Sequence, residues 1–414
     1  MPSVLLLTST YPYPPGEQFL EDEINYWCRS GFDPVWILPT SVEGTPRPLP
    51  DGVQVFLAPQ RQGPARLVVS ACRAVFSKAL LRELGYLASR RELTPRRTWL
   101  AIRELMLVNL AEGRLRKVLA ERHVDVVYSY WNNAACYAAC RLKRKGWPIK
   151  VVSRAHGADL YEERRELSYM PLKWQYAGLA DALFCLSPEA AAYFVRTYGA
   201  AKQTVSVAPL GVSLPATRAR RSQPPAVQVV SLSFCVPVKR LDRILEAVQR
   251  LAATMPDRRV TWTHIGDGPL YESLKSEADL AARHQANLQC EFTGHLPHQE
   301  VKRFFADSPV DVFINSSASE GMPVSIMEAM SFGVPVIAPD VGSVAGLVSD
   351  ERGRLLSAEP GPEEIAEAIR QCVLAPEKSR ENMARSASEH IERHFNADVN
   401  YPRFIAAVER VLAR

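Results

Sequence analysis

The chain has 414 residues, of which 47% are hydrophobic and 23% charged, a composition typical of a soluble globular protein too long for one compact core. Its net charge of +5 is modest, and no apolar run reaches the ~18 residues that a membrane span needs. The first residues lack the basic lead and cleavage site of a signal peptide. Cys136 and Cys140 are the only close pair among the eight cysteines, and no histidine or second cysteine pair stands nearby at zinc-ligand spacing, which predicts reduced thiols in a cytoplasmic protein.

Strand and helix patterns alternate along the whole chain, which favours parallel α/β sheets. Residues 213–225 are proline-rich, basic and aperiodic, which predicts a linker between a domain at 1–212 and a domain at 226–399. The predicted strands are 4–8, 35–38, 124–129, 150–153, 182–186 and 205–208 in the first half, and 227–232, 260–265, 289–293, 310–315 and 335–338 in the second.

The loop after the first predicted strand contains Gly16 and Glu17. Gly16 can supply an unusual backbone angle close to a ligand, and Glu17 is a candidate acceptor-binding residue. The alternative is a turn followed by an acidic helix start, which the helix dipole favours. Trp131, at another strand end, is a candidate acceptor platform, and packing is the alternative explanation.

Residues 61–122 contain fourteen Lys or Arg against five Glu, a balance of +9 that leaves −4 for the rest of the chain. The same region contains apolar groups at 67–69, 75–76 and 105–108. Such a surface suits an anionic membrane or a phosphate-bearing acceptor. The alternative is a solvated, arginine-rich helical face. We expect no nucleic acid partner, because no nucleic-acid-binding motif accompanies the charge.

Candidate residues follow three more predicted strands, at the strand ends where open α/β sheets bind their ligands. His156 and Asp159 follow the strand at 150–153, although a lone histidine is more often a structural residue. Lys239 lies where a strand passes into a helix, and its ammonium group can reach a diphosphate. Gly266 and Gly268 follow the next strand, where glycines allow close backbone approach. A solvated lysine and an ordinary turn are the alternatives for these last two features.

The segment 319–330 contains two carboxylates, Glu320 and Glu328, at a junction between a predicted strand and a predicted helix. The start of a helix after a parallel strand offers free backbone N–H groups to an anion such as a diphosphate. The carboxylates would repel phosphate, so they suit hydroxyl groups. A nucleotide-sugar, which has both phosphates and hydroxyls, satisfies every group here. The alternative is a surface helix with a solvated glutamate.

From Glu320 to Met330 the residues read Glu-Gly-x-Pro-Val-Ser-x-x-Glu-Ala-Met. This segment resembles the E-x7-E signature of the retaining, metal-independent glycosyltransferases of family 4 (group 1), especially the bacterial exopolysaccharide and colanic-acid type. The resemblance spans nearly the whole chain. It implies the GT-B fold, in which two Rossmann-like parallel-sheet domains face a central cleft. It also implies that the last helix, at 400–414, packs back on the N-terminal domain.

The resemblance implies a role for each candidate residue. Glu328 would bind the donor ribose, Glu320 would face the donor sugar, and Lys239 would stabilise the departing diphosphate. His156 would lie near the donor sugar and the reacting phosphate oxygen, and Asp159 is assigned to the acceptor side with Glu17 and Trp131. The remaining implied donor contacts are Gly16, Gly266, Gly268, His295, Leu296 and the backbone of Gly321, Met322, Pro323, Val324 and Ser325.

The chain departs from the family pattern at two places. Phe234 stands where the family usually has a phosphate-binding arginine, so Lys239 would act with hydroxyls or with Arg240. Gly346 stands where a glutamate is usual, which affects the donor pocket. No Asp-x-Asp motif occurs, so we expect neither a metal nor another cofactor.

We therefore expect a hexosyltransferase that uses a nucleotide-diphosphate sugar and a lipid-linked or oligosaccharide acceptor in bacterial surface polysaccharide or glycolipid synthesis. We expect it in the cytoplasm, peripheral on the inner membrane face. There are two alternatives. One is a sugar-nucleotide epimerase or phosphorylase of the same fold. The other, suggested by the departures at Phe234 and Gly346, is a non-catalytic partner subunit that binds a nucleotide-sugar.

Overall fold

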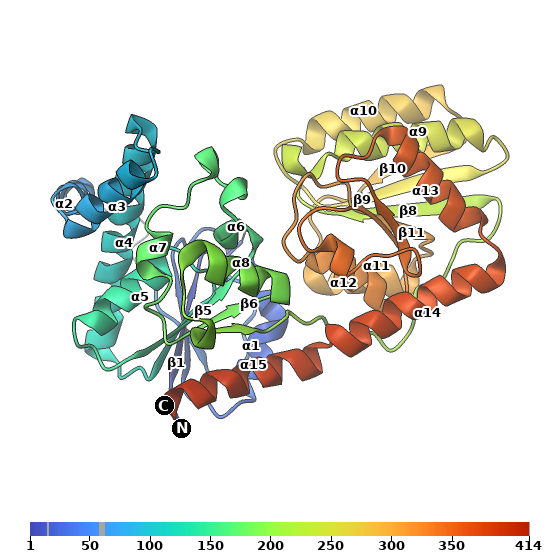
Figure 1. The fold of residues 1–414 in the computed structure, drawn as a ribbon. Coiled ribbons are helices and arrows are strands. Elements are labelled where there is room, and N and C mark those ends of the chain that lie inside the picture. The colour runs from blue at the N-terminus through green and yellow to red at the C-terminus, as the bar shows by residue number, and fades with distance from the viewer. Residues whose placement is uncertain (15, 58–62, 414) are drawn as a thin grey trace. The chain divides into compact units, whose positions relative to one another are not determined.

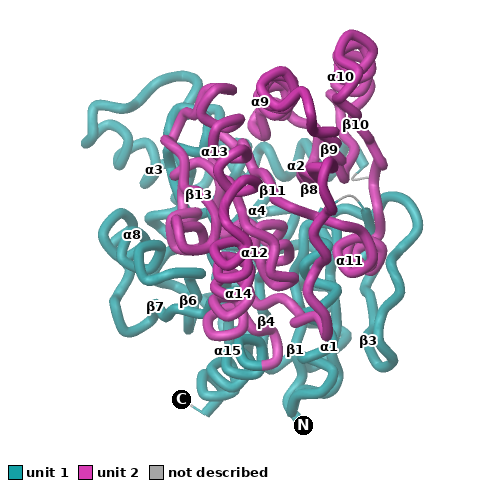
Figure 2. Tube along the Cα trace, turned by 90° about the vertical axis from the view of Figure 1, so that its right-hand side faces the viewer, with its two compact units in different colours: residues 1–210, 399–414 teal, residues 211–398 magenta. Residues whose placement is uncertain are grey.

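The computed structural model describes residues 1–14, 16–57 and 63–413. The chain forms two compact units, residues 1–210 with 399–414 and residues 211–398, which Figure 2 shows in different colours. The predicted linker, 213–225, falls in the second unit, where the backbone N–H of Val310 donates to the carbonyl of Arg220. Positions 61 and 62 of the predicted basic region, and 414 of the predicted last helix, lie outside the described residues.

The first unit is built on a seven-stranded parallel sheet with the order β3-β2-β1-β4-β5-β6-β7. The strands are β1 (Val4–Thr8), β2 (Val35–Pro39), β3 (Val53–Val55), β4 (Val126–Ser129), β5 (Lys150–Ala155), β6 (Ala182–Cys185) and β7 (Val205–Val207). Only β3 lacks a predicted counterpart, because it is a three-residue edge strand without an apolar run. The strand order reverses between β1 and β4, and ligands of such sheets bind beside that switch point.

Helices pack on both faces of this sheet, and Figure 1 shows α2, α3 and the start of α4 grouped to one side of it. The helix α4 begins with a proline, and the Thr94 side chain caps it by accepting from the Arg97 N–H. The helices are α1 (Leu20–Cys28), α2 (Pro64–Val75), α3 (Lys78–Ser89), α4 (Pro95–Glu121), α5 (Ala134–Arg144), α6 (Gly157–Leu160), α7 (Lys173–Tyr176) and α8 (Pro188–Tyr198).

The last helix, α15 (Ala397–Leu412), packs on the first unit's sheet. The Phe404 ring lies 5.2 Å from Tyr128, 5.0 Å from Phe184 and 5.9 Å from Trp27, measured between ring centroids. The Asn400 side chain donates to the Leu210 carbonyl at 2.9 Å. Burial of these aromatic rings stabilises the return of the chain to the N-terminal sheet.

The second unit contains a six-stranded parallel sheet with the order β10-β9-β8-β11-β12-β13, which reverses between β8 and β11. The strand β13 begins at Gly353, because a Cβ there would lie 1.9 Å from the Val336 carbonyl. A strand that begins with glycine and arginine has no apolar run at its start, so the sequence analysis did not predict it. The strands are β8 (Ala226–Leu232), β9 (Arg259–Ile265), β10 (Leu288–Phe292), β11 (Val312–Ile314), β12 (Val336–Pro339) and β13 (Gly353–Leu356). The helices are α9 (Leu241–Thr254), α10 (Tyr271–His284), α11 (His298–Asp307), α12 (Val324–Ser331), α13 (Pro362–Leu374) and α14 (Glu377–His394).

All eight cysteines are free thiols. Among the described helices, none combines the length and the apolar character that a membrane crossing requires.

Candidate functional site

Lys239 and Glu320 meet at the carboxyl edge of the second sheet, where the loops after β8 and β11 lie side by side. The Lys239 Nζ donates to Glu320 Oε1 at 2.6 Å, and the same oxygen accepts from Asn315 Nδ2 at 2.9 Å and Ser317 Oγ at 2.6 Å. Burial by itself would raise the pKa of Glu320. The Lys239 charge and these hydrogen bonds outweigh burial and hold the pKa below its usual value, so the carboxylate stays ionised.

Hydrogen bonds to backbone carbonyls fix these two loops to each other. The Ser316 hydroxyl donates to the carbonyls of Lys239 at 2.7 Å and Arg240 at 3.0 Å, and the Ala318 N–H donates to the Val238 carbonyl. Arg240 has a positive φ of 48°, and its buried Nη1 has no hydrogen-bond partner among the described residues. The Arg240 guanidinium, one residue after Lys239 in the chain, therefore has unused donor capacity.

Glu328 lies on α12 and is 8% exposed. Its Oε1 lies within hydrogen-bond distance of Nε2 of His298, the first residue of α11. The sequence analysis missed His298, although it follows the predicted donor-binding residues His295 and Leu296 by only a few positions. In the structure His295 is exposed and Leu296 is half-buried in the loop that leads into α11.

Gly266 and Gly268 hold three loops together. Their φ angles are 139° and 145°, and a Cβ at Gly266 would lie 2.0 Å from the Ser233 carbonyl. The Gly266 N–H donates to the Gly294 carbonyl at 2.9 Å, and the Cys235 N–H donates to the Asp267 carbonyl at 2.7 Å. The close approach that these glycines permit is therefore to the neighbouring loops after β8 and β10.

The predicted diphosphate-binding backbone, 321–325, leads into α12. Pro323 is the N-cap residue and Val324 the first helical residue. The Gly321 carbonyl accepts from the Ser343 N–H at 3.2 Å, which ties this segment to the loop after β12, and Met322 is half-buried beside it. The N–H groups of Val324 and Ser325 lie in the first helical turn, where no intrahelical acceptor exists for them.

His156 of the first unit lies directly after β5. Its ring stacks on Tyr130 at 4.6 Å and lies 4.6 Å from the Trp131 ring, measured between centroids. Both ring nitrogens are buried and lack a hydrogen-bond partner in the described part of the chain. Burial, together with the Arg154 charge, holds the pKa of His156 well below its usual value, so the imidazole is neutral.

The other candidate carboxylates of the first unit have backbone partners. Asp159 accepts from the N–H groups of His156 at 2.5 Å and Asn132 at 2.6 Å. Glu17 accepts from Trp131 Nε1 at 2.5 Å. It also accepts from the N–H groups of Ser9, Thr10 and Tyr11, at 2.9, 2.7 and 2.6 Å. These contacts make both carboxylates supports of their loops.

The turn around Glu17 has an unusual backbone. Gly16 has a φ of 86°, as its sequence position suggested, and Glu17 itself has a φ of 53°. A non-glycine residue adopts this left-handed region only when other interactions hold it there. The three backbone N–H groups that bind the Glu17 carboxylate supply those interactions.

The sequence analysis missed two buried cations of the first unit. Arg154 forms an ion pair with Glu23 at 2.7 Å, and both side chains are fully buried. Lys173 donates to Oδ1 of Asn132 at 2.7 Å, and burial lowers its pKa to about 8. The only sequence signal for these residues is a charged residue within a strongly apolar stretch, as at Arg154 in β5.

Two family models match this chain. The model described as "Glycosyl transferases group 1" matches residues 218–390, and the model described as "Glycosyltransferase Family 4" matches residues 17–215. The chain belongs to the group 1 glycosyltransferases. The family predicted from the E-x7-E segment is thereby confirmed.

Relatives of this group 1 chain include a colanic acid biosynthesis glycosyltransferase, WcaL of Escherichia coli, which is 24% identical over 260 residues. This match covers 60% of the chain and 62% of WcaL. The D-inositol 3-phosphate glycosyltransferase of Kribbella flavida is 27% identical over 294 residues, which cover 65% of the chain and 68% of that protein. The chain thus spans about three-fifths to two-thirds of the length of these two relatives.

Solved structures share the fold over the whole length. Anabaena HepE, solved with UDP and glucose, superposes with a TM-score of 0.67 at 15% identity, covering 99% of this chain and 100% of HepE. The lipopolysaccharide outer core galactosyltransferase WaaB superposes with a TM-score of 0.66 at 14% identity, covering 99% of each chain. The predicted GT-B fold of two Rossmann-like domains is confirmed by these likenesses.

Proposed function

We propose that this protein transfers a hexose from a nucleotide-diphosphate sugar to an acceptor hydroxyl in bacterial polysaccharide or glycolipid synthesis. The contact between Lys239 and Glu320, with Glu328 on the adjoining helix, is the observation that carries the proposal. It combines a cation for a diphosphate with two buried carboxylates for hydroxyl groups. The names of WcaL and WaaB, which refer to colanic acid and lipopolysaccharide, support the pathway.

In the proposed donor complex, Glu328 accepts hydrogen bonds from the ribose hydroxyls and Glu320 accepts from the sugar. The diphosphate lies at the N-terminus of α12, where free N–H groups and the helix dipole favour an anion. Arg240, whose Nη1 has no partner among the described residues, takes the place of the arginine that Phe234 replaces. HepE, which was solved with UDP, supports a nucleotide ligand.

The proposed reaction is a retaining transfer. The acceptor oxygen forms a bond to the anomeric carbon on the face from which the nucleotide leaves. The bond from that carbon to the phosphate oxygen breaks, and the nucleoside diphosphate keeps the electron pair and takes the acceptor proton. Lys239 and Arg240 offset the charge that develops on the diphosphate. No divalent metal has a role in this proposal, because the sequence lacks an Asp-x-Asp motif.

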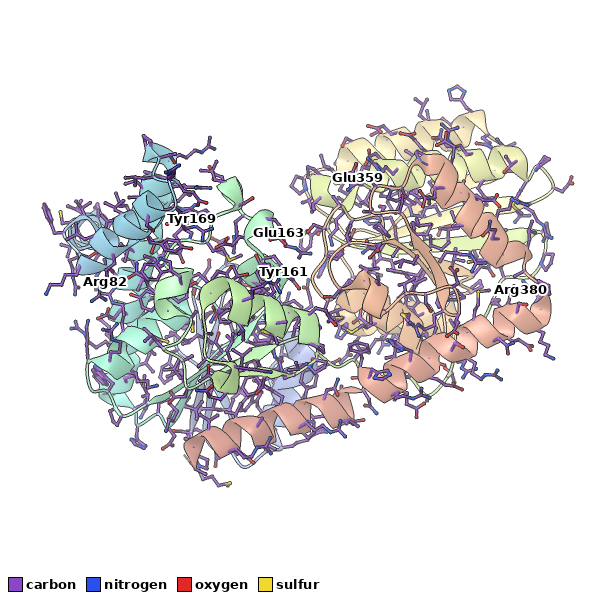
Figure 3. All side chains as sticks on the ribbon, in the orientation of Figure 1. Arg82, Tyr161, Glu163, Tyr169, Glu359 and Arg380 are labelled. Atoms are coloured by element: carbon purple, nitrogen blue, oxygen red, sulfur yellow. The ribbon has the colours of Figure 1, made fainter. Side chains whose placement is uncertain are left out.

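We also propose that α2 and α3 bind the anionic inner face of the cytoplasmic membrane. Exposed apolar side chains on and between these helices include Val68 at 61%, Phe76 at 87% and Leu81 at 68%. Arg73 and Arg82 accompany them on the same two helices, and Figure 3 labels Arg82. Apolar groups among cations are the features by which amphipathic helices bind acidic lipid.

Vesicle sedimentation tests the membrane proposal. The full chain should sediment with vesicles that contain phosphatidylglycerol and stay in solution with neutral vesicles. A Phe76→Ser, Leu81→Ser variant should lose this binding. A Leu280→Ser variant, which changes an exposed leucine of the second unit, should keep it. Equal sedimentation of all three proteins, or equal binding to neutral vesicles, would refute this surface.

Donor screening followed by a transfer assay tests the enzymatic proposal. The full chain is first screened by thermal shift against uridine, guanosine and adenosine diphosphate sugars, because a ligand of the folded state raises its melting temperature. The stabilising donor is then incubated with a membrane lipid extract, and labelled glycolipid is measured. A new sugar nucleotide formed from the donor alone would indicate an epimerase. Donor binding without any product from several acceptor classes would indicate a non-catalytic subunit.

A further inference from the structure

Two adjoining cavities open in the first unit. One has a volume of about 490 Å³ and is lined by α4, the start of α5 and part of the segment 165–173. The other, of about 630 Å³, is lined by α2, α4 and residues 56–57, which follow β3. Leu110 and Arg114 of α4 line both. A single ligand can therefore occupy both cavities with its middle part at Arg114.

The first cavity contains cations with unused donor capacity. Arg103, Arg114 and Arg165 line it. Neither Arg103 nor Arg165 has a side-chain hydrogen bond or ion pair within the described ranges, although Arg103 lies over the Trp99 ring. Arg114 donates once, to the Thr40 carbonyl at 2.7 Å. Guanidinium groups bind phosphate oxygens in pairs, so this lining suits a phosphate ester.

Two of the three carboxylates among the described residues that line the first cavity have partners other than these arginines. Glu166 is paired with Arg96, and Asp159 is held by backbone N–H groups. Glu104 is the remaining one. Burial raises the pKa of Glu104, although the charges of Lys173, Arg165 and Arg103 act in the opposite direction. A carboxylate in this position suits the hydroxyl groups of a sugar.

Tyr169, labelled in Figure 3, fixes one wall of the first cavity. Its hydroxyl donates to Glu83 of α3 at 2.7 Å. The fully buried Glu83 carboxylate also accepts from the Leu172 N–H at 3.0 Å, Trp174 Nε1 at 2.8 Å and Gln175 Nε2 at 2.6 Å. Four hydrogen bonds to one buried carboxylate preform this wall before any ligand arrives.

The second cavity is more apolar. Its lining includes Phe56, Leu57 and Val69, and Leu57 and Val69 are 69% and 56% exposed. The described lining also contains one carboxylate, Glu121, and five cations, which are Arg66, Arg73, Arg114, Arg116 and Lys117. A cavity lined by apolar groups and cations suits the hydrocarbon chain of an anionic lipid.

We infer that the acceptor is a glycan joined through phosphate to a hydrocarbon chain, and that it binds in these two cavities. Its sugar and phosphate occupy the first cavity, at Glu104 and the three arginines. Its chain passes Arg114 into the second cavity. This inference rests on the proposed glycosyl transfer and selects a lipid-linked acceptor over a free oligosaccharide.

Calorimetric titration of the full chain, without any nucleotide-sugar, tests the inference. The probes are a hexosyl methyl phosphodiester, a hexosyl octyl phosphodiester and a neutral octyl hexoside. The octyl phosphodiester should bind at least about tenfold more tightly than the methyl one, because its chain buries apolar area. It should also bind about tenfold more tightly than the neutral hexoside, because the neutral probe cannot form charge-assisted hydrogen bonds with the arginines. Equal affinity for all three probes would overturn the inference.

Paired variants locate the binding. Arg103→Gln should weaken both phosphodiesters about tenfold, whereas Arg122→Gln, directly after the end of α4 and outside both cavities, should not. Val69→Asp should remove the advantage of the octyl chain. Val68→Asp, which changes the adjacent exposed valine outside both cavities, should keep that advantage. If the two variants of either pair bind the probes equally well, the probe binds outside the cavity which that pair tests.

One more variant separates this site from the donor site. If Lys239→Ala abolishes phosphodiester binding and Arg103→Gln does not, the probe occupies the nucleotide-sugar site and the inference is wrong. Tight octyl phosphodiester binding without sugar transfer would preserve this inference and contradict the proposed function. Transfer to a free oligosaccharide that Arg103→Gln leaves unchanged would preserve the proposed function and contradict this inference.

Discussion

Lys239 Nζ lies 2.6 Å from Glu320 Oε1, although the two residues are 81 positions apart in the sequence. The contact joins the loops that follow β8 and β11, the two strands between which the order of the second sheet reverses. A cation and a carboxylate thus lie together at the place where such sheets bind ligands. Removing either charge will therefore change both the local electrostatic potential and the binding of a donor.

We expect Lys239→Ala to lower kcat of the proposed transfer by about 10² to 10³, because the lysine offsets charge on the leaving diphosphate. The variant also leaves the buried Glu320 carboxylate without its cation, so its pKa should rise. Steady-state kinetics measure the first effect. Lys378→Ala, an exposed lysine of α14, is the control. Equal kcat values for the two variants would remove Lys239 from the mechanism.

We expect Glu328→Gln to weaken the affinity for the nucleotide-sugar by about tenfold, because a neutral amide accepts a hydrogen bond less strongly than a carboxylate. Glu328→Ala should weaken it further. Calorimetric titration with the donor found by thermal shift gives both values. Glu381→Gln, on the exposed side of α14, should bind the donor like the unmodified protein. An unchanged affinity in Glu328→Ala would show that the ribose binds elsewhere.

We expect Glu17→Gln to lower the free energy of unfolding by about 1–3 kcal/mol, because its carboxylate accepts from three backbone N–H groups. A glutamine oxygen cannot satisfy all of them. Urea denaturation measures the loss. The acceptor KM of the surviving folded protein should not change, since these contacts occupy the carboxylate. A higher acceptor KM with unchanged stability would restore the acceptor role predicted from the sequence.

The buried pair of Glu23 and Arg154 should be costly to break. We expect Glu23→Gln to lose about 3–5 kcal/mol of stability, because it leaves the fully buried arginine uncompensated. The double variant Glu23→Leu, Arg154→Met should lose less than the single one. Urea denaturation of the full chain, followed by near-ultraviolet circular dichroism, measures the loss of stability in both variants. A double variant less stable than Glu23→Gln would contradict this account.

The fully buried His264 should make stability depend on pH. Its Nδ1 lies 2.8 Å from Ser231 Oγ and its Nε2 3.3 Å from Cys235 Sγ, and burial lowers its pKa to about 4. An unfolded histidine takes up a proton below about 6.5, whereas the folded one stays neutral. The unfolded state therefore binds more protons between these values, so stability is complete above pH 6.5 and falls as the pH drops toward 4.

The shift corresponds to about 3 kcal/mol of stability at neutral pH. His264→Gln should lack this contribution, so its unfolding free energy should change less between pH 7 and pH 4.5 than that of the unmodified protein. Denaturation curves at the two pH values give the difference. Identical changes in both proteins would show that burial does not lower the pKa of His264.

The local sequence determined the central strands, because each is a short apolar run between turn signals. It also indicated the family, because the group from Glu320 to Glu328 lies within one strand–loop–helix segment. Edge strands were different. The strand β3 has three residues, and β13 begins at Gly353, so neither has an apolar run of its own. Pairing with β2 and β12 creates them.

The tertiary structure alone decided which polar groups meet. His298 meets Glu328, which is 30 positions away in the sequence. Glu23 meets Arg154, which is 131 positions away. It also showed that Glu17 binds backbone N–H groups, and it produced the two cavities along α4. Such contacts depend on how strands and helices pack in space. Residue type and local periodicity determine an element, whereas the partner of a buried charge is fixed only when distant elements fold together.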